Sequence, residues 1–132
     1  ARRPARAMPG AREAPLAAAL ARLDAIERAD LAGHGAVDRH YGAVGDVVRD
    51  FLHDTARVAR RRTATTTLVR ELPTDAAPAE PTARVLGAAD LVKYARVAPD
   101  ARTAGRFVAE VRDVLRGWDG TGETPGGDDA VR

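Results

Sequence analysis

Lys93 is the only lysine in a chain of 132 residues whose other basic residues are all arginine. It lies in segment 88–100, an apolar run that ends at a Pro-Asp pair. Asp90 and Lys93 are three residues apart, a helical spacing that allows an exposed ion pair of about 0.2–0.5 kcal/mol. One interpretation is structural, with this ion pair and the Tyr94 ring at the edge of the core. The other is a recognition surface made of Lys93, Tyr94 and Arg96.

No arrangement of residues typical of a catalytic site is recognisable in the sequence. The chain has no serine and no cysteine, which excludes their nucleophiles, disulfides and thiolate zinc sites. The threonine run at 63–67 has no neighbouring histidine to activate it. His34, His40 and His53 match no metal-ligand spacing with a carboxylate, and glycine-rich segment 117–127 lacks the strand and helix that flank a phosphate-binding loop. We therefore expect no enzymatic activity, no metal and no cofactor.

Arginines gather in two parts of the sequence and favour negatively charged partners. The members are Arg2, Arg3, Arg6 and Arg12 near the start, and Arg57, Arg60, Arg61 and Arg62 in the middle. Arginine pairs well with phosphate, so nucleic-acid binding is an alternative function. Against it, aromatic residues that stack on bases form only 4% of the chain, and no zinc-finger spacing is present. The arginines at 60–62 are also candidates for electrostatic steering of a protein partner.

Composition predicts an all-α domain. Alanine supplies much of the 45% hydrophobic content and favours helix over other regular structure. No apolar run approaches the roughly 20 residues needed to span a bilayer, and no signal peptide is recognisable. The absence of cysteine is consistent with a reducing compartment. Interaction with a copy of itself through alanine-rich faces is a third possible role.

Apolar spacing predicts a small bundle of about five helices. The expected helices run from Pro15 to about 33, from about 36 to 58, from Thr65 or Thr66 (one of them as N-cap) to Leu72, from about 82 to 95, and from Asp100 to near 117. Segment 73–81, with three prolines, is expected to be an irregular connection. The predicted core is Leu20, Leu23, Ile26, Tyr41, Val44, Val48, Phe51, Leu86, Val92, Phe107, Val111 and Leu115. We expect a flexible basic leader at 1–13, a helical domain at 14–117 and a flexible acidic tail at 118–132.

Between residues 16 and 116 the order of elements resembles the cytoplasmic region of BatD-like aerotolerance membrane proteins. The most specific match is Ala89-Asp90-Leu91-Val92-Lys93-Tyr94-Ala95, followed by Pro99 at the start of the last helix. Tyr94 stands where that family usually has phenylalanine. The threonine-rich turn lacks the family's usual acidic residue, and the connection at 73–81 is richer in proline.

The resemblance implies a non-catalytic interaction domain on a membrane-anchored protein, at the cytoplasmic face of the bacterial inner membrane. The implied partners are a MoxR-type AAA+ ATPase or a von Willebrand factor A protein. The implied transmembrane helix lies outside this chain, and the four arginines of the leader are expected next to the membrane, where cytoplasmic segments are rich in Lys and Arg. Lys93, Tyr94 and Arg96 are the expected partner contacts, with Arg60, Arg61 and Arg62 as the steering patch.

Overall fold

The computed structural model describes residues 13–120, which form five α-helices and one short 3-10 helix. The elements are α2 (Glu13–Ala29), η2 (Ala32–His34), α3 (Val37–Asp54), α4 (Thr65–Glu71), α5 (Ala79–Tyr94) and α6 (Ala101–Asp119). The predicted all-α class with about five helices is confirmed. The basic leader with Arg2, Arg3, Arg6 and Arg12, and the acidic residues after 120, lie outside the described residues.

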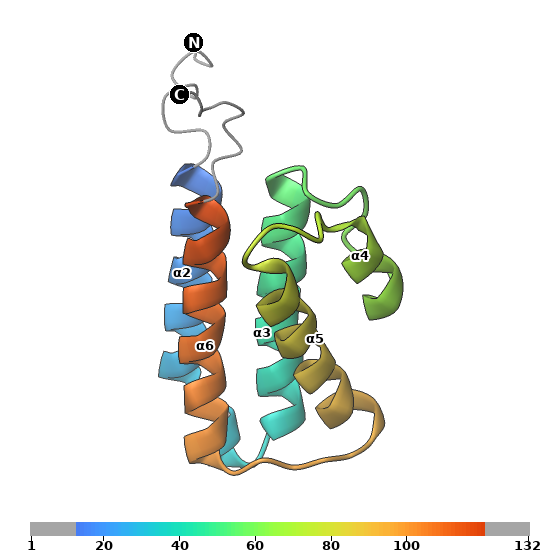
Figure 1. Cartoon of the computed structure of the whole chain (residues 1–132). Coiled ribbons are helices and arrows are strands. Elements are labelled where there is room, and N and C mark those ends of the chain that lie inside the picture. The colour runs from blue at the N-terminus through green and yellow to red at the C-terminus, as the bar shows by residue number, and fades with distance from the viewer. Residues whose placement is uncertain (1–12, 121–132) are drawn as a thin grey trace.

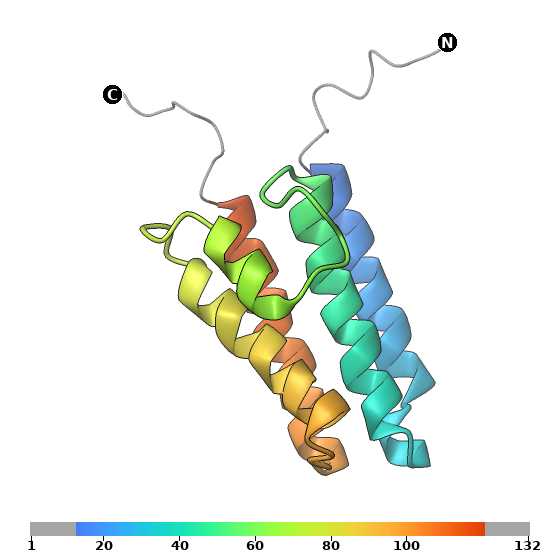
Figure 2. The ribbon, with the colours of Figure 1, turned by 90° about the vertical axis from the view of Figure 1, so that its right-hand side faces the viewer.

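The four long helices form an antiparallel bundle. In Figure 1, α2 and α5 descend while α3 and α6 ascend, and α2 lies beside α6 as α3 lies beside α5. The short helix α4 interrupts the connection from α3 to α5. Figure 2 shows α4 lying over the outer face of the α3–α5 pair, close to one end of the bundle. The other half of that face carries no further helix among residues 13–120.

The bundle core consists mainly of leucine and valine, with four aromatic rings buried among them. Every predicted core residue is buried except Leu20 and Ile26, which are partly buried and pack against the core from α2. The rings of Tyr41 and Phe107 stack with centroids 4.4 Å apart, which joins α3 to α6. His40 is also buried and its Nε2 donates to the carbonyl of Ala104 over 2.9 Å.

Several predicted helix boundaries were wrong, each for a local reason. Helix α2 ends at Ala29, not near 33, because Asp30 adopts a positive φ of 50° and the chain continues as η2. Helix α3 ends at Asp54, not near 58, because Ala56 adopts a positive φ of 62° and the next two N–H groups bond back to the Leu52 carbonyl. Helix α5 begins at Ala79 because Pro81 falls in the first turn, where the missing N–H has no helical partner. The N-cap of α4 is Ala64, with no side-chain cap, so the predicted threonine cap is absent.

Helix α6 confirms its predicted start and corrects its predicted end. The Asp100 carboxylate accepts from the Thr103 N–H over 2.8 Å, as an N-cap does. At the other end α6 continues through Asp119, and Trp118 is only 1% exposed. Trp118 therefore belongs to the helical domain, not to an acidic tail that begins at 118.

Candidate functional site

A groove runs along the uncovered half of the outer α3–α5 face. Its central hollow holds about 230 Å³ and is lined by both helices and by the loop before α4. A second hollow of about 480 Å³ continues toward Thr65 and Thr66, and shares Arg49, Thr63, Asp90 and Tyr94 with the first. A third, of about 390 Å³, continues past Lys93 to Arg96 and Val97. Each hollow is open to solvent on one side, so together they form an elongated groove.

Small residues create the floor of the central hollow. A Cβ atom at Gly45 would lie 3.5 Å from the Cβ of Ala89, so the two helices approach closely there. A Cβ atom at Gly42 would meet nothing within 4 Å. The hollow over Gly42 thus has room for a side chain that neither helix supplies.

Three cations and two carboxylates line the central hollow, and their partners differ. Arg49 donates to the Thr63 carbonyl over 2.6 Å and to Thr65 Oγ1 over 2.8 Å, which are both uncharged acceptors. Arg62 instead lies 3.4 Å from the Asp46 carboxylate, which compensates both charges. The positive charge of Arg49 has no carboxylate within ion-pair distance among residues 13–120.

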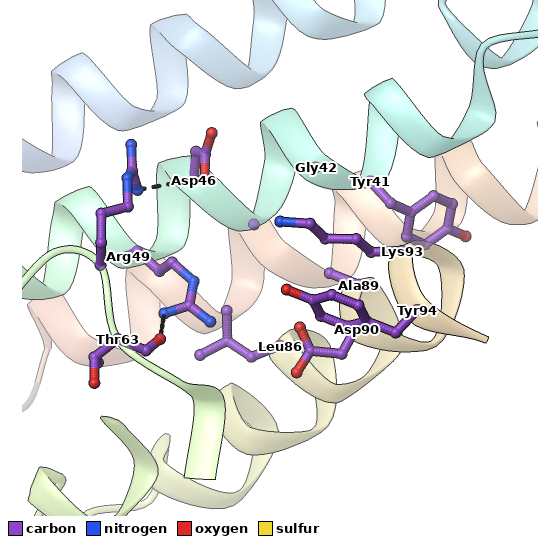
Figure 3. Close-up of a pocket in the computed structure, with 12 residues that line it drawn as sticks. Tyr41, Gly42, Asp46, Arg49, Thr63, Leu86, Ala89, Asp90, Lys93 and Tyr94 are labelled. Carbon is purple, nitrogen blue, oxygen red and sulfur yellow. Dashed lines mark hydrogen bonds and ion pairs between the residues drawn. The ribbon is translucent and has the colours of Figure 1, made fainter. Parts of the chain in front are cut away.

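Lys93 and Tyr94 enter the groove from the last turn of α5. Figure 3 shows Lys93 extending across the hollow toward α3, with Tyr94 and Asp90 beside it. The Lys93 ammonium lies 5.3 Å from the centre of the Tyr94 ring. In the described part of the chain it forms no ion pair with Asp90, so the sequence expectation of that pair was wrong.

The structural interpretation placed the Tyr94 ring at the edge of the core, and this expectation was wrong. Tyr94 is 73% exposed, and Leu91 and Val97 are 56% and 46% exposed. These three are the exposed large hydrophobic residues of the described chain, and they follow one another at intervals of three along segment 91–97. Exposed apolar side chains that gather in one place are typical of interaction sites, whereas scattered ones are not. We call Leu91, Tyr94 and Val97 the apolar patch.

Arg96 follows α5 in a backbone conformation that arginine disfavours. Its φ is 57°, in the left-handed region, and the Val97 N–H bonds back to the Leu91 carbonyl over 3.4 Å. An L-residue in this region costs about 1–2 kcal/mol, which glycine avoids. The Arg96 side chain is exposed and has no hydrogen bond or ion pair with residues 13–120. A strained, exposed and unpaired arginine next to the apolar patch is consistent with a role in recognition.

Replacing Arg96 by glycine tests how much of this residue is needed for folding. We expect Arg96→Gly to raise the free energy of unfolding by about 0.5–1 kcal/mol, because the left-handed strain disappears. Arg96→Ala is the matched control and should leave stability within about 0.5 kcal/mol of the wild type, since it keeps the strain. Urea unfolding measures both. A glycine variant no more stable than the alanine variant would contradict the strain.

The arginines at 60–62 do not form one free positive patch. Arg61 bonds to Asp50 over 3.1 Å and to Asp54 over 3.0 Å, and Arg62 pairs with Asp46. Arg60 is exposed and lies outside the groove. The carboxylates of α3 therefore compensate much of the charge that was expected to steer a partner, and the steering role stays a prediction.

The sequence pattern located part of this site and missed the rest. It singled out Lys93, Tyr94 and Arg96, which lie in or beside the groove, together with Arg62. It missed Gly42 and Arg49, whose importance depends on which helix faces α3. Leu91 carried a weak signal, because it lies off the buried stripe of α5 that includes Val85, Ala89 and Val92. Val97 follows the end of that helix.

Residues 13–120 contain no group of three or more His, Cys, Asp or Glu side chains placed to hold a metal ion. Of the helices in that range, none combines the length and apolarity needed to cross a membrane. Comparison with protein families, with curated proteins and with solved structures found no match to this chain.

Proposed function

We propose that this chain is a non-catalytic protein-interaction domain and that the apolar patch with the adjoining groove is its recognition surface. The observation that carries the proposal is the position of Leu91, Tyr94 and Val97, which gather all exposed large hydrophobic residues of the described chain in one segment. Tyrosine and arginine are enriched among residues that dominate binding energy at protein interfaces. Tyr94 and Arg96 supply one of each.

The resemblance to BatD-like proteins supplies the partners to test. They are a MoxR-type AAA+ ATPase and a von Willebrand factor A protein of the same organism. In this proposal the chain binds them at the cytoplasmic face of the inner membrane. Nucleic-acid binding gains no support from Arg61 and Arg62, since both are held by carboxylates of α3. The membrane location is part of the proposal, and fractionation of the native full-length protein tests it.

Isothermal titration of each purified partner with the chain tests the surface. We expect a variant with Leu91→Ser, Tyr94→Ala and Val97→Ser to bind at least about tenfold more weakly, equivalent to about 1.4 kcal/mol. Its thermal midpoint should not fall, because these side chains are exposed. Arg28→Ala, at an exposed residue of the last turn of α2, is the control and should bind as the wild type does.

Two results would count against the proposal. If neither partner binds the wild-type chain, the partners implied by the resemblance are wrong. If a partner binds the triple variant as tightly as the wild type, the recognition surface lies elsewhere.

A further inference from the structure

We propose that the groove takes an acidic segment of a partner protein, with one carboxylate side chain between Arg49 and Lys93 and apolar side chains on the apolar patch. The inference rests on the proposed function and names the chemistry of the partner. It is carried by the uncompensated charge of the central hollow, by the open space over Gly42 and by the elongated shape of the groove.

Charge selects an acidic occupant. Arg62 and Asp46 neutralise each other. Among residues 13–120, in contrast, Arg49 donates only to uncharged oxygens, and Lys93 lies over the Tyr94 ring without an ion pair. Asp90 is the remaining carboxylate that lines the central hollow, so two positive charges face one negative charge. Arg49 is half-buried, where the effective dielectric constant is lower and an incoming carboxylate is attracted more strongly than on an open surface.

Shape selects a peptide segment over a compact small molecule. The central hollow of about 230 Å³ opens at both ends into further hollows of about 480 and 390 Å³, so the space is elongated and is not one compact cavity. One side chain fits over Gly42 while its neighbours continue along the groove. Helix α4 already covers one half of this face, so a partner segment on the other half would complete the layer (Figure 2).

The carboxylates around the groove argue against a membrane surface or a nucleic acid as the occupant. Asp46 and Asp90 line the central hollow, and Asp38 lines the hollow beside Arg96. A surface with many phosphate groups would contact these carboxylates as well as the cations, and the carboxylates would repel it. A peptide can place a single carboxylate between Arg49 and Lys93 and apolar side chains elsewhere, which avoids that repulsion.

Selection from a displayed library of random short peptides, with the intact chain as bait, tests the inference. We expect the enriched peptides to combine Asp or Glu with large apolar residues. Binding of a synthetic copy of the most enriched peptide is then measured by fluorescence anisotropy. Gly42→Leu fills the hollow and should weaken binding at least about tenfold. Gly105→Leu is the matched control, because it also adds a side chain to a helical glycine with open space above it, but on α6.

Lys93 provides a second pair of variants that does not depend on how the glycine variants fold. Lys93→Gln should weaken binding of the acidic peptide by about fivefold or more, whereas Lys93→Arg, which keeps the charge, should retain it. Replacing the Asp or Glu residues of the peptide by Asn or Gln should reproduce the loss. Circular dichroism confirms that each variant is folded.

The inference is overturned if the enriched peptides are not acidic, or if an acidic peptide binds Gly42→Leu and Lys93→Gln as tightly as the wild type. Preferential binding of vesicles rich in anionic phospholipid, or of single-stranded DNA, with loss in the same variants also overturns it. If these tests fail while the Leu91, Tyr94 and Val97 variant still loses its protein partner, the proposed function stands and only the acidic occupant is wrong.

Discussion

Trp118→Ala is expected to lower the free energy of unfolding by about 3–5 kcal/mol, the usual cost of removing a fully buried tryptophan. The indole is 1% exposed and its Nε1 donates to Thr82 Oγ1 over 2.7 Å. The Thr82 hydroxyl in turn donates to the Pro78 carbonyl over 2.7 Å, so Trp118 joins the end of α6 to the start of α5. The Arg57 guanidinium lies over the ring, 5.0 Å from its centre, and donates to the Trp118 carbonyl over 2.9 Å. Small domains have about 5–15 kcal/mol in total, so this loss is severe.

Two further variants separate packing from hydrogen bonding at Trp118. Trp118→Phe keeps most of the buried ring and should cost less than Trp118→Ala. Thr82→Val removes the acceptor and leaves the indole N–H buried without this acceptor, which should lower the free energy of unfolding by about 1–3 kcal/mol. Urea unfolding followed by circular dichroism measures each difference. If Trp118→Ala changed stability by less than about 1 kcal/mol, Trp118 would not be part of the core.

Urea unfolding of chains that are shortened at the C-terminal end tests where the domain ends. A chain that stops at Gly117, the boundary predicted from sequence, lacks the Trp118 ring and should lose about as much stability as Trp118→Ala. A chain that stops at Gly120 keeps the ring and should unfold as the longer chain does. Equal stability of the two truncated chains would contradict the assignment of Trp118 to the core.

Helices with a regular apolar stripe could be predicted from the sequence, and contacts between helices could not. The spacing of Tyr41, Val44, Val48 and Phe51 predicts α3, because a period of 3.6 residues places them on one face. Trp118 was missed because it precedes a segment rich in Gly and Asp, so the local composition indicated a tail. Its burial depends on Thr82 and Arg57, which are 36 and 61 residues away in the sequence.

The candidate site likewise has a part that could be predicted from the sequence and a part that depends on contacts between helices. Lys93 and Tyr94 are unusual in their own local sequence, so the pattern alone identified them. The groove that they enter exists because Gly45 of α3 closely approaches Ala89 of α5 and Gly42 leaves open space beside them, which no local pattern reveals. The charge of Arg61 was misjudged for a related reason, since its partners lie 7 and 11 residues earlier, on the preceding helix.

Asp50→Asn is expected to lower the free energy of unfolding by about 1–2 kcal/mol at pH 7, because Asp50 joins three arginines to α3. The Asp50 side chain is only 16% exposed, and it accepts from Arg22 of α2 over 2.8 Å and from Arg61 over 3.1 Å. Arg62 lies 3.9 Å away. These contacts fasten both α2 and the loop before α4 to α3.

The pH dependence of this difference identifies its origin. Burial raises the pKa of Asp50, but hydrogen bonds from Arg22 and Arg61 outweigh burial and hold the pKa below its ordinary value. A carboxyl group with a lowered pKa in the folded state stabilises the fold fully above its unfolded pKa of about 3.9. That stabilisation is lost as the pH falls through the lower folded value. The difference between wild type and Asp50→Asn should therefore be constant from about pH 5 to pH 7 and shrink progressively as the pH falls below the unfolded pKa of about 3.9.

Urea unfolding of both proteins at several pH values and low salt measures this difference, with Asp113→Asn, at an exposed carboxylate of α6, as the control. Glu27 and Asp100 also have lowered pKa values, so the wild type should lose stability in acid through more than one group. Subtracting the variant isolates Asp50. A difference that stayed constant down to pH 2 would mean that the Asp50 charge is not what holds Arg22 and Arg61. Arg61 would then be held by Asp54 and not by Asp50, and its positive charge would be less compensated than these contacts indicate.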